Sequence, residues 1–294
     1  MEKNFRTDLA SEAHLRWKKS RTAASLPGVF TSRRDEDGFS LEITEVRDRK
    51  ASLELCKPIG RYVTMELGAL LRREEDAFAR ACGVLSRELR ARLALREGES
   101  VLVVGLGNAD ITPDAVGPLA AEQVLVTRHL TEQMPEEFGA FRPVSVFCSG
   151  VLGTTGVESA ALTGAVAQLV APSRIIAVDA LAAGEIGHLC RTIQLTDAGI
   201  VPGSGVGNAR SALTEEALGI PVIALGVPTV VDARTLCADL TGEGDIPYPT
   251  EGELFVTPRD IDCRVRDVSR LLGYAINLAL HDGLTVEDID MYLS

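Results

Sequence analysis

The stretch that decides the fold of this 294-residue chain is VLVVGLGNADITPDAVGP, residues 101–118. Its first four residues are apolar, which is typical of a strand buried on both faces of a parallel sheet. Two glycines interrupt the run, and Thr112-Pro113-Asp114 has the composition of a helix start. We expect that helix to continue through residues 116–133. A strand, a glycine loop and a helix start place Asp114 at the carboxyl edge of an open α/β sheet, where such sheets bind their ligands.

The glycine loop is a poor match to a dinucleotide-binding fingerprint. Its residues 105–110 read GLGNAD, so Asp110 stands where the fingerprint needs its third glycine. Two carboxylates, Asp110 and Asp114, would also face any phosphate bound at the helix start. Nucleotide binding is therefore disfavoured. Taken alone, Asp114 is better interpreted as a carboxylate that complements the helix dipole.

A second apolar run, RIIAVDAL at residues 174–181, is predicted to be a buried strand that ends on Asp179. A carboxylate in that position needs a partner or a solvated cleft. If both strands bring their Asp to the same sheet edge, the two carboxylates share a proton and titrate as a coupled pair. One can then act as general base on water and the other as general acid. The pattern leaves open whether the two strands are neighbours.

The rest of the chain predicts a doubly wound α/β fold, with a mainly parallel sheet flanked by helices. Residues 41–46 and 62–67 alternate in strand fashion, which predicts a small N-terminal antiparallel element. Residues 1–32 are polar and predict an N-terminal arm, followed by a single domain over residues 33–294. The other expected strands are 144–148, 192–195 and 221–226; the other expected helices are 74–95, one that runs from a capping box at 155–158 to 170, 230–240 and 259–281.

Composition excludes several classes of function. The formal charge of −12 disfavours binding to nucleic acid or to anionic membranes. The sequence contains no run of 18 apolar residues, so no membrane span is predicted. Its charged start lacks the apolar core of a secretory signal. The six cysteines form no C-x-x-C pair, which fits a reduced, cytoplasmic setting. Cys148 and Cys237 lie in apolar contexts and are predicted to be core thiols.

Several segments, taken in order, resemble the germination protease of endospore-forming bacteria. The resemblance covers most of residues 1–234 and resumes around 255–258. It implies an atypical aspartic endopeptidase of the spore core that uses Asp114 and Asp179, needs no cofactor and degrades small acid-soluble spore proteins. It also implies a homo-oligomer, a tetramer in the family. The matching segments include FRTDLASEA (5–13), GRYVTMEL (60–67), the stretch 101–118, RPVSVFCSGVLGTTGVES (142–159), IIAVDALAA (175–183), GIVPGSGVGNAR (199–210) and LGIPVIALGVPTVVDA (218–233).

The N-terminal segment TDLASE, residues 7–12, resembles the site at which the family cuts spore proteins. An acidic residue is followed by an apolar one, by Ala and then by a second acidic residue. We therefore expect a zymogen that cuts itself between Asp8 and Leu9 and releases the propeptide 1–8. A substrate-like segment in the chain's own arm has a high effective concentration at the active site.

The sequence departs from the family pattern in three places. Only a short loop, around residues 241–253, stands where the family usually carries a longer insertion. Gly184 replaces a common Arg, and Val201 replaces a His before the glycine-rich loop 202–208. These changes affect substrate contacts and regulation while leaving both Asp positions intact.

Two other functions stay open. The first is a metal-dependent processing peptidase of the hydrogenase-maturation type, in which Asp114 and Asp179 supply oxygen ligands. His129 and His188 are candidate ligands there only by elimination. The second is an inactive homologue that binds spore proteins without cutting them.

Overall fold

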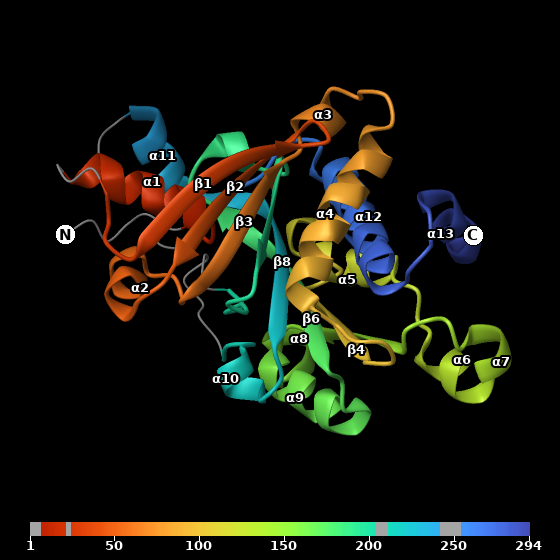
Figure 1. The fold of residues 1–294 in the computed structure, drawn as a ribbon. Helices are drawn as coiled ribbons and strands as arrows, with labels where there is room; N and C mark the ends of the chain where they lie inside the picture. Colours follow the sequence, from red (N-terminus) through yellow and green to blue (C-terminus); the bar gives the residue numbers. More distant parts are fainter. Residues whose placement is uncertain (1–6, 22–24, 204–210, 242–253) are drawn as a thin grey trace.

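The computed structural model describes residues 7–21, 25–203, 211–241 and 254–294 (Figure 1). Its described residues form a nine-stranded sheet in the order β1-β2-β3-β7-β8-β6-β4-β5, with β9 paired to β8. The strands are β1 (Val29–Glu36), β2 (Phe39–Val46), β3 (Gly60–Glu66), β4 (Val101–Leu106), β5 (Val144–Gly150), β6 (Arg174–Ala183), β7 (Thr192–Thr196), β8 (Val222–Asp232) and β9 (Phe255–Val256).

Helices flank this sheet and confirm the α/β class. They are α1 (Ala10–Ser20), α2 (Arg49–Leu55), α3 (Gly68–Leu71), α4 (Ala77–Leu93), α5 (Val116–Ala121), α6 (Arg128–Gln133), α7 (Pro135–Phe138), α8 (Leu152–Thr155), α9 (Ser159–Val170), α10 (Glu215–Leu218), α11 (Ala233–Thr241), α12 (Ile261–Leu280) and α13 (Val286–Leu293), with the 3₁₀ turns η1 (Thr112–Asp114) and η2 (Ile186–His188).

The sheet has a parallel half and an antiparallel half. Strands β8, β6, β4 and β5 run parallel to one another, whereas β1, β2, β3 and β7 pair antiparallel. The antiparallel part is therefore larger than expected, because β3 joins the main sheet through β7. Strand β1 was not predicted from the sequence, and it lies partly inside the expected arm. It is an exposed edge strand with six consecutive exposed residues, so it carries no hydrophobic alternation.

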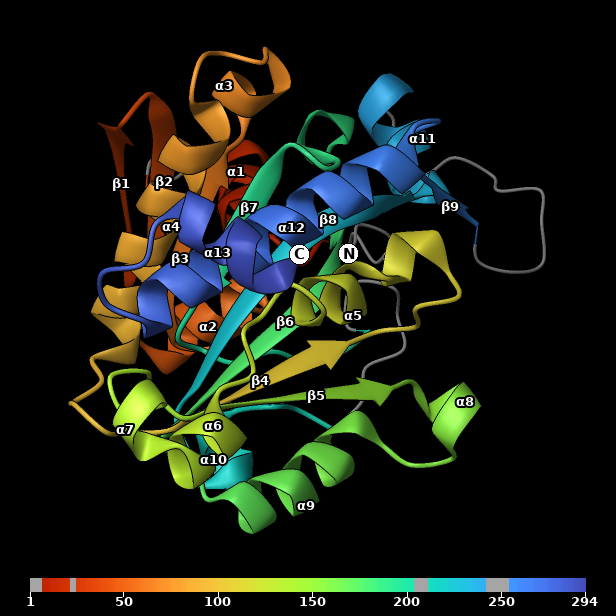
Figure 2. The same ribbon diagram turned by 90° about the vertical axis from the view of Figure 1, so that its right-hand side faces the viewer.

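Alternate residues of the central strands pack against opposite helical layers. On β4, Val101 and Val103 contribute to a core shared with α4, α5 and α12. Leu102 and Val104 point to the other face, where they join a core that includes residues of α9. Figure 2 shows α4 and α12 on one side of the parallel strands and α9 on the other. Burial on both faces explains the continuous apolar run in this strand.

The N-terminal helix α1 packs on α2, β2 and β3. Leu9 and Ala10 are completely buried, although the segment around them is polar. Residues 9–20 are thus held against the sheet. Whether residues 1–32 act as a unit separate from residues 33–294 stays a prediction.

The prediction of one long helix over 116–133 is wrong, since α5 ends at Ala121 and α6 begins only at Arg128. The buried side chain of Asn277, on α12, explains the break. Its amide donates to the carbonyl of Gln123 at 2.8 Å and its carbonyl accepts from the amide of Leu125 at 2.9 Å. Tertiary hydrogen bonds therefore replace helical ones here.

Two smaller predictions also fail. The expected capping box at residues 155–158 does not form, because Thr155 belongs to α8 and the N-cap of α9, Glu158, makes no side-chain cap. Cys148 is exposed and Cys237 is only half-buried. The Cys148 prediction is wrong because β5 is an edge strand of the sheet.

Candidate active site

A tight turn after β4 positions Asp114. Gly107 has φ of +107°, and a Cβ there would lie 2.1 Å from the carbonyl oxygen of Asp114, so the turn requires glycine. The amide of Asn108 donates to Asp114 Oδ2 at 2.8 Å. The expected helix start is a 3₁₀ turn, and Thr112 belongs to that turn instead of capping a helix with its side chain. The α-helix follows only at Val116.

Asp179 lies on β6 and is 6% exposed. The expectation that its strand ends there is wrong, since β6 continues to Ala183 alongside the long strand β8. The pairing of β6 with β4 nevertheless ends before Asp179, because the last β4–β6 pair is Gly105 with Val178. Asp179 is therefore the first residue of β6 beyond the end of that ladder. The amide of Ala180 donates to Asp179 Oδ1 at 2.9 Å.

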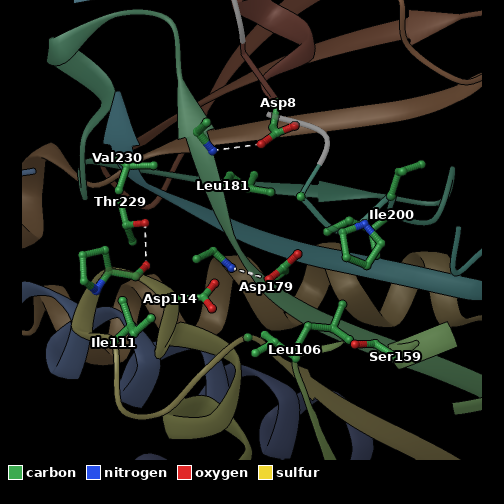
Figure 3. Close-up of a pocket in the computed structure, with 18 of the residues that line it drawn as sticks. Asp8, Leu106, Ile111, Asp114, Ser159, Asp179, Leu181, Ile200, Thr229 and Val230 are labelled. Atoms are coloured by element: carbon green, nitrogen blue, oxygen red, sulfur yellow. Dashed lines mark hydrogen bonds between the residues drawn. The ribbon is translucent and has the colours of Figure 1, made fainter. Parts of the chain in front are cut away.

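Asp114 and Asp179 line the same cavity, which has a volume of about 400 Å³. Figure 3 shows both side chains directed into it, Asp114 from the turn η1 that follows β4 and Asp179 from within β6. Strands β4 and β6 are adjacent and parallel, as the sequence-based architecture requires. The surrounding lining is largely apolar and includes Leu106, Ile111, Leu181 and Val230. Such a lining disfavours two negative charges at once.

Thr229, on β8, also lines this cavity and was not predicted from the sequence. Thr229 Oγ1 donates to the carbonyl of Pro113 at 2.7 Å, so β8 holds the turn that carries Asp114. The carbonyl of Thr229 accepts from Thr257 Oγ1 at 2.9 Å. Thr229 is 1% exposed in an otherwise apolar strand, and that polar interruption is the signal that could have found it.

The N-terminal arm also lines the cavity, through Asp8. One backbone hydrogen bond and one hydrogen bond to a side chain join the arm to β6. The amide of Asp8 donates to the carbonyl of Ala182 at 2.9 Å, and the amide of Ala182 donates to Asp8 Oδ2 at 2.8 Å. The second of these contacts is drawn in Figure 3. The expected cleavage point thus lies at the wall of the cavity that Asp114 and Asp179 line, with Leu9 fully buried.

Two side chains hold the backbone of the arm. Gln194 on β7 accepts from the amide of Ala10 at 2.8 Å and donates to the carbonyl of Asp8 at 3.1 Å. Lys57 Nζ donates to the carbonyl of Thr7 at 2.8 Å. Burial lowers the pKa of Lys57, while the nearby charges of Asp8 and Glu12 oppose that effect.

The two candidate histidine ligands do not line the cavity. His129 is exposed on α6. His188 Nδ1 lies 2.5 Å from Glu12 Oε1, in contact with α1. Within the described residues, no cluster of three or more His, Cys, Asp or Glu side chains could hold a metal ion. The loop at 202–208 and the shortened loop at 241–253 lie mostly outside the described residues.

Comparison with known proteins shows the class and the family of this protein. Residues 7–242 match the family model described as "Germination protease". A germination protease of Caldanaerobacter subterraneus subsp. tengcongensis is 38% identical and aligns with 98% of each chain. The germination protease of Clostridium tetani is 35% identical, over 99% of this chain and all of the relative. The chain is a protease by these matches, and it belongs to the germination protease family.

Among solved structures, a hydrogenase maturation protease from Thermococcus kodakarensis is similar over 64% of this chain and 98% of its own, with a TM-score of 0.37 and 17% identity. The alignment with the Caldanaerobacter relative spans 321 positions, more than the 294 residues of this chain, so it includes gaps in this chain. In the described part of the chain, no helix is both long and apolar enough to cross a membrane.

Proposed function

We propose that this chain is an endopeptidase that degrades small acid-soluble spore proteins, with Asp114 and Asp179 as a paired acid/base site. The observation that supports it best is the shared cavity, into which the turn after β4 and the adjacent parallel strand β6 each direct one carboxylate. Membership of a protease family supports the reaction class. The spore-protein substrate rests on the family resemblance.

The proposed reaction needs one proton shared by the two carboxylates. The ionised carboxylate removes a proton from a water molecule, whose oxygen attacks the peptide carbonyl carbon. The protonated carboxylate donates to the departing amine nitrogen as the C–N bond breaks. Because the two groups are coupled, the roles belong to the pair and not to either residue alone.

The substrate and reaction can be tested together. A chain that begins at Leu9 is incubated with a purified small acid-soluble spore protein, and the cut sites are read by mass spectrometry. We expect cuts between an acidic and an apolar residue, as at Asp8–Leu9, and no cuts by the Asp114→Asn chain. Asp110→Asn, at an exposed carboxylate four residues away, is the matched control and should cut normally.

Two results would redirect the assignment. Activity abolished by a chelator and restored by a divalent metal would favour the metal-dependent alternative. A folded chain that binds the spore protein without cutting it would favour the inactive homologue.

We further propose that the full chain is a zymogen cut between Asp8 and Leu9. The docked arm supports this, because Asp8 occupies part of the cavity wall. The arm is held at Ala182, three residues along β6 from Asp179, which corresponds to roughly 10 Å of strand. The bond must therefore leave this docked position, or meet the pair of another copy, before it is cut. Acidification would supply the single proton that the pair needs.

Intact-mass analysis tests the processing step. After incubation at mildly acidic pH, the wild-type chain should lose residues 1–8, whereas the Asp114→Asn chain should keep them. An unchanged wild-type mass over the whole acidic range, or a cut at another bond, would reject this step.

A further inference from the structure

Glu12 is a buried carboxylate, 2% exposed, that stands outside the proposed reaction. Its Oε2 accepts from the amide of Gly184 at 2.6 Å and its Oε1 accepts from the amide of Glu185 at 3.1 Å. The hydroxyl of Thr7 also donates to Oε2, and His188 contacts Oε1. These contacts fix both carboxylate oxygens of Glu12 next to the start of α1.

We propose that Glu12 binds the α-ammonium group that Leu9 gains when the bond between Asp8 and Leu9 is cut. This inference rests on the proposed processing. It gives the processed chain a specific ion pair that the full chain lacks.

The helix geometry brings the two groups together. Leu9 is the N-cap of α1, so Glu12 is at the third helical position, N3. A glutamate at N3 reaches back to the backbone nitrogen of the N-cap residue in a capping box. In the full chain the hydroxyl of Thr7 stands between them, because it accepts from the amide of Leu9 at 3.0 Å and donates to Glu12. Removal of residues 1–8 takes this bridging hydroxyl away and leaves the two groups facing each other.

The charges around Leu9 after the cut favour an ion pair between its ammonium group and Glu12. Cutting removes the carboxylate of Asp8 and creates a positive charge at the N-terminus of a helix, where the helix dipole disfavours it. Leu9 is completely buried before the cut, and a buried ammonium group requires a partner. Lys57 lies close enough to interact with both Asp8 and Glu12, so it adds a second cation on the same side. Glu12 is the carboxylate that is already linked to the amide of Leu9, through the hydroxyl of Thr7.

The new ion pair would be linked to the catalytic strand. The amides of Gly184 and Glu185 follow directly after β6, which carries Asp179. The same carboxylate would then hold both the mature N-terminus and the end of that strand. Processing would exchange a hydrogen bond from the neutral Thr7 hydroxyl to Glu12 for one from a charged ammonium group, which adds an ion pair.

The test uses a chain whose tag is removed by an added protease so that Leu9 becomes the first residue, and it therefore needs no self-cleavage. The pKa of the Leu9 α-amine is measured by competitive acetylation across pH. An unpaired α-amine titrates near about 7.7–8.0. We expect a pKa higher by about one unit or more, since a tenfold preference for the charged form corresponds to one unit. Glu12→Gln should return the pKa to the ordinary range.

Thermal unfolding gives a second readout. Nα-acetylation of Leu9 should lower the Tm by roughly 3–6 °C in the Glu12 chain and have little effect in the Glu12→Gln chain. Glu185→Gln is the matched control, because that carboxylate contacts Lys19 and not the arm at Leu9. It should keep the acetylation effect.

An ordinary α-amine pKa in the unsubstituted Leu9 chain would overturn the inference, even if Glu12→Gln fails to fold. An equal loss of Tm on acetylation with and without Glu12 would overturn it as well. Failure of the full chain to process itself would instead reject the zymogen proposal and leave this measurement unaffected.

Discussion

Backbone amides orient both candidate catalytic carboxylates. The amide of Asn108 donates to Asp114, and the amide of Ala180 donates to Asp179. A backbone donor on a short turn or a sheet edge has little freedom, so it fixes a carboxylate oxygen better than a flexible side chain would. An Asp→Asn change at either position keeps the size of the side chain, which makes it a clean probe of proton transfer.

His188 gives the docked arm a pH dependence. The hydrogen bond that His188 makes to Glu12 raises the pKa of His188, and this effect outweighs burial, which lowers it. A pKa above the unfolded value means that the pair stabilises the fold fully below about pH 6.5, and that this contribution is lost as the pH rises through the raised pKa. His188→Gln should therefore lower the free energy of unfolding by roughly 1–2 kcal/mol in mild acid and by less in mild base.

The measurement is urea unfolding at two pH values, in an Asp114→Asn background that keeps the arm attached. His129→Gln, at an exposed histidine, is the control and should change little at either pH. The same loss for His188→Gln in acid and in base would contradict the prediction.

At the scale of elements, the close approach of α5 to the central strands positions the turn that carries Asp114. A Cβ on Gly117 would lie 2.1 Å from the carbonyl oxygen of Leu106 and 2.5 Å from that of Val178. Gly117→Ala should therefore destabilise the fold by roughly 2 kcal/mol or more and lower the activity, because α5 and η1 must shift. Gly153→Ala, which meets no atom within 4 Å, is the control in urea unfolding and activity assays. A Gly117→Ala chain with unchanged stability would contradict this account.

The end of α12 makes the fold sensitive to acid. Burial lowers the pKa of His281 to about 4. The folded chain then binds fewer protons than the unfolded chain between about pH 6.5 and pH 4, so stability falls as the pH falls through that window. His281→Leu should flatten the acid side of the stability curve, measured as Tm against pH. A curve parallel to that of the unsubstituted chain would show that the pKa of His281 is the same in the folded and unfolded chains, and would contradict the prediction.

Several elements were predictable because local pattern and tertiary environment agree. Strand β4 is buried on both faces and its sequence is a continuous apolar run. Strand β1 is exposed and charged, so nothing in its sequence marks it; it exists because β2 pairs with it. The end of β6 was placed too early because its continuation depends on β8, which lies more than forty residues further along the chain.

That Asp114 and Asp179 would reach the same edge of the sheet could be predicted from two local strand patterns and one topological rule, and both residues line one cavity. The wall formed by Thr229 and the docking of the arm could not. Asp8 meets Ala182 across 174 positions of sequence, and Glu12 meets Gly184 across 172. Contacts of that range are set by the packed fold and leave no local signal.

At the scale of the whole molecule, we propose that the chain assembles as a homo-oligomer, as its resemblance to the family implies. Sedimentation at micromolar concentration should show a species larger than the 31.4 kDa chain. A monomer as the sole species would contradict the proposal. The processed and full-length forms should be compared, because the cut removes Asp8, which is hydrogen-bonded to Ala182 on β6 in the full chain.

The central claim, that Asp114 and Asp179 act as one unit, is tested most directly by kcat/KM of the two Asp→Asn chains and of the double variant on a spore-protein peptide. Each single change should lower kcat/KM by about 10²–10⁴-fold. Groups that act as a unit are not additive, so the double variant should be no slower than the slower single variant. Losses that multiply in the double variant, or a nearly normal rate in either single variant, would contradict the claim.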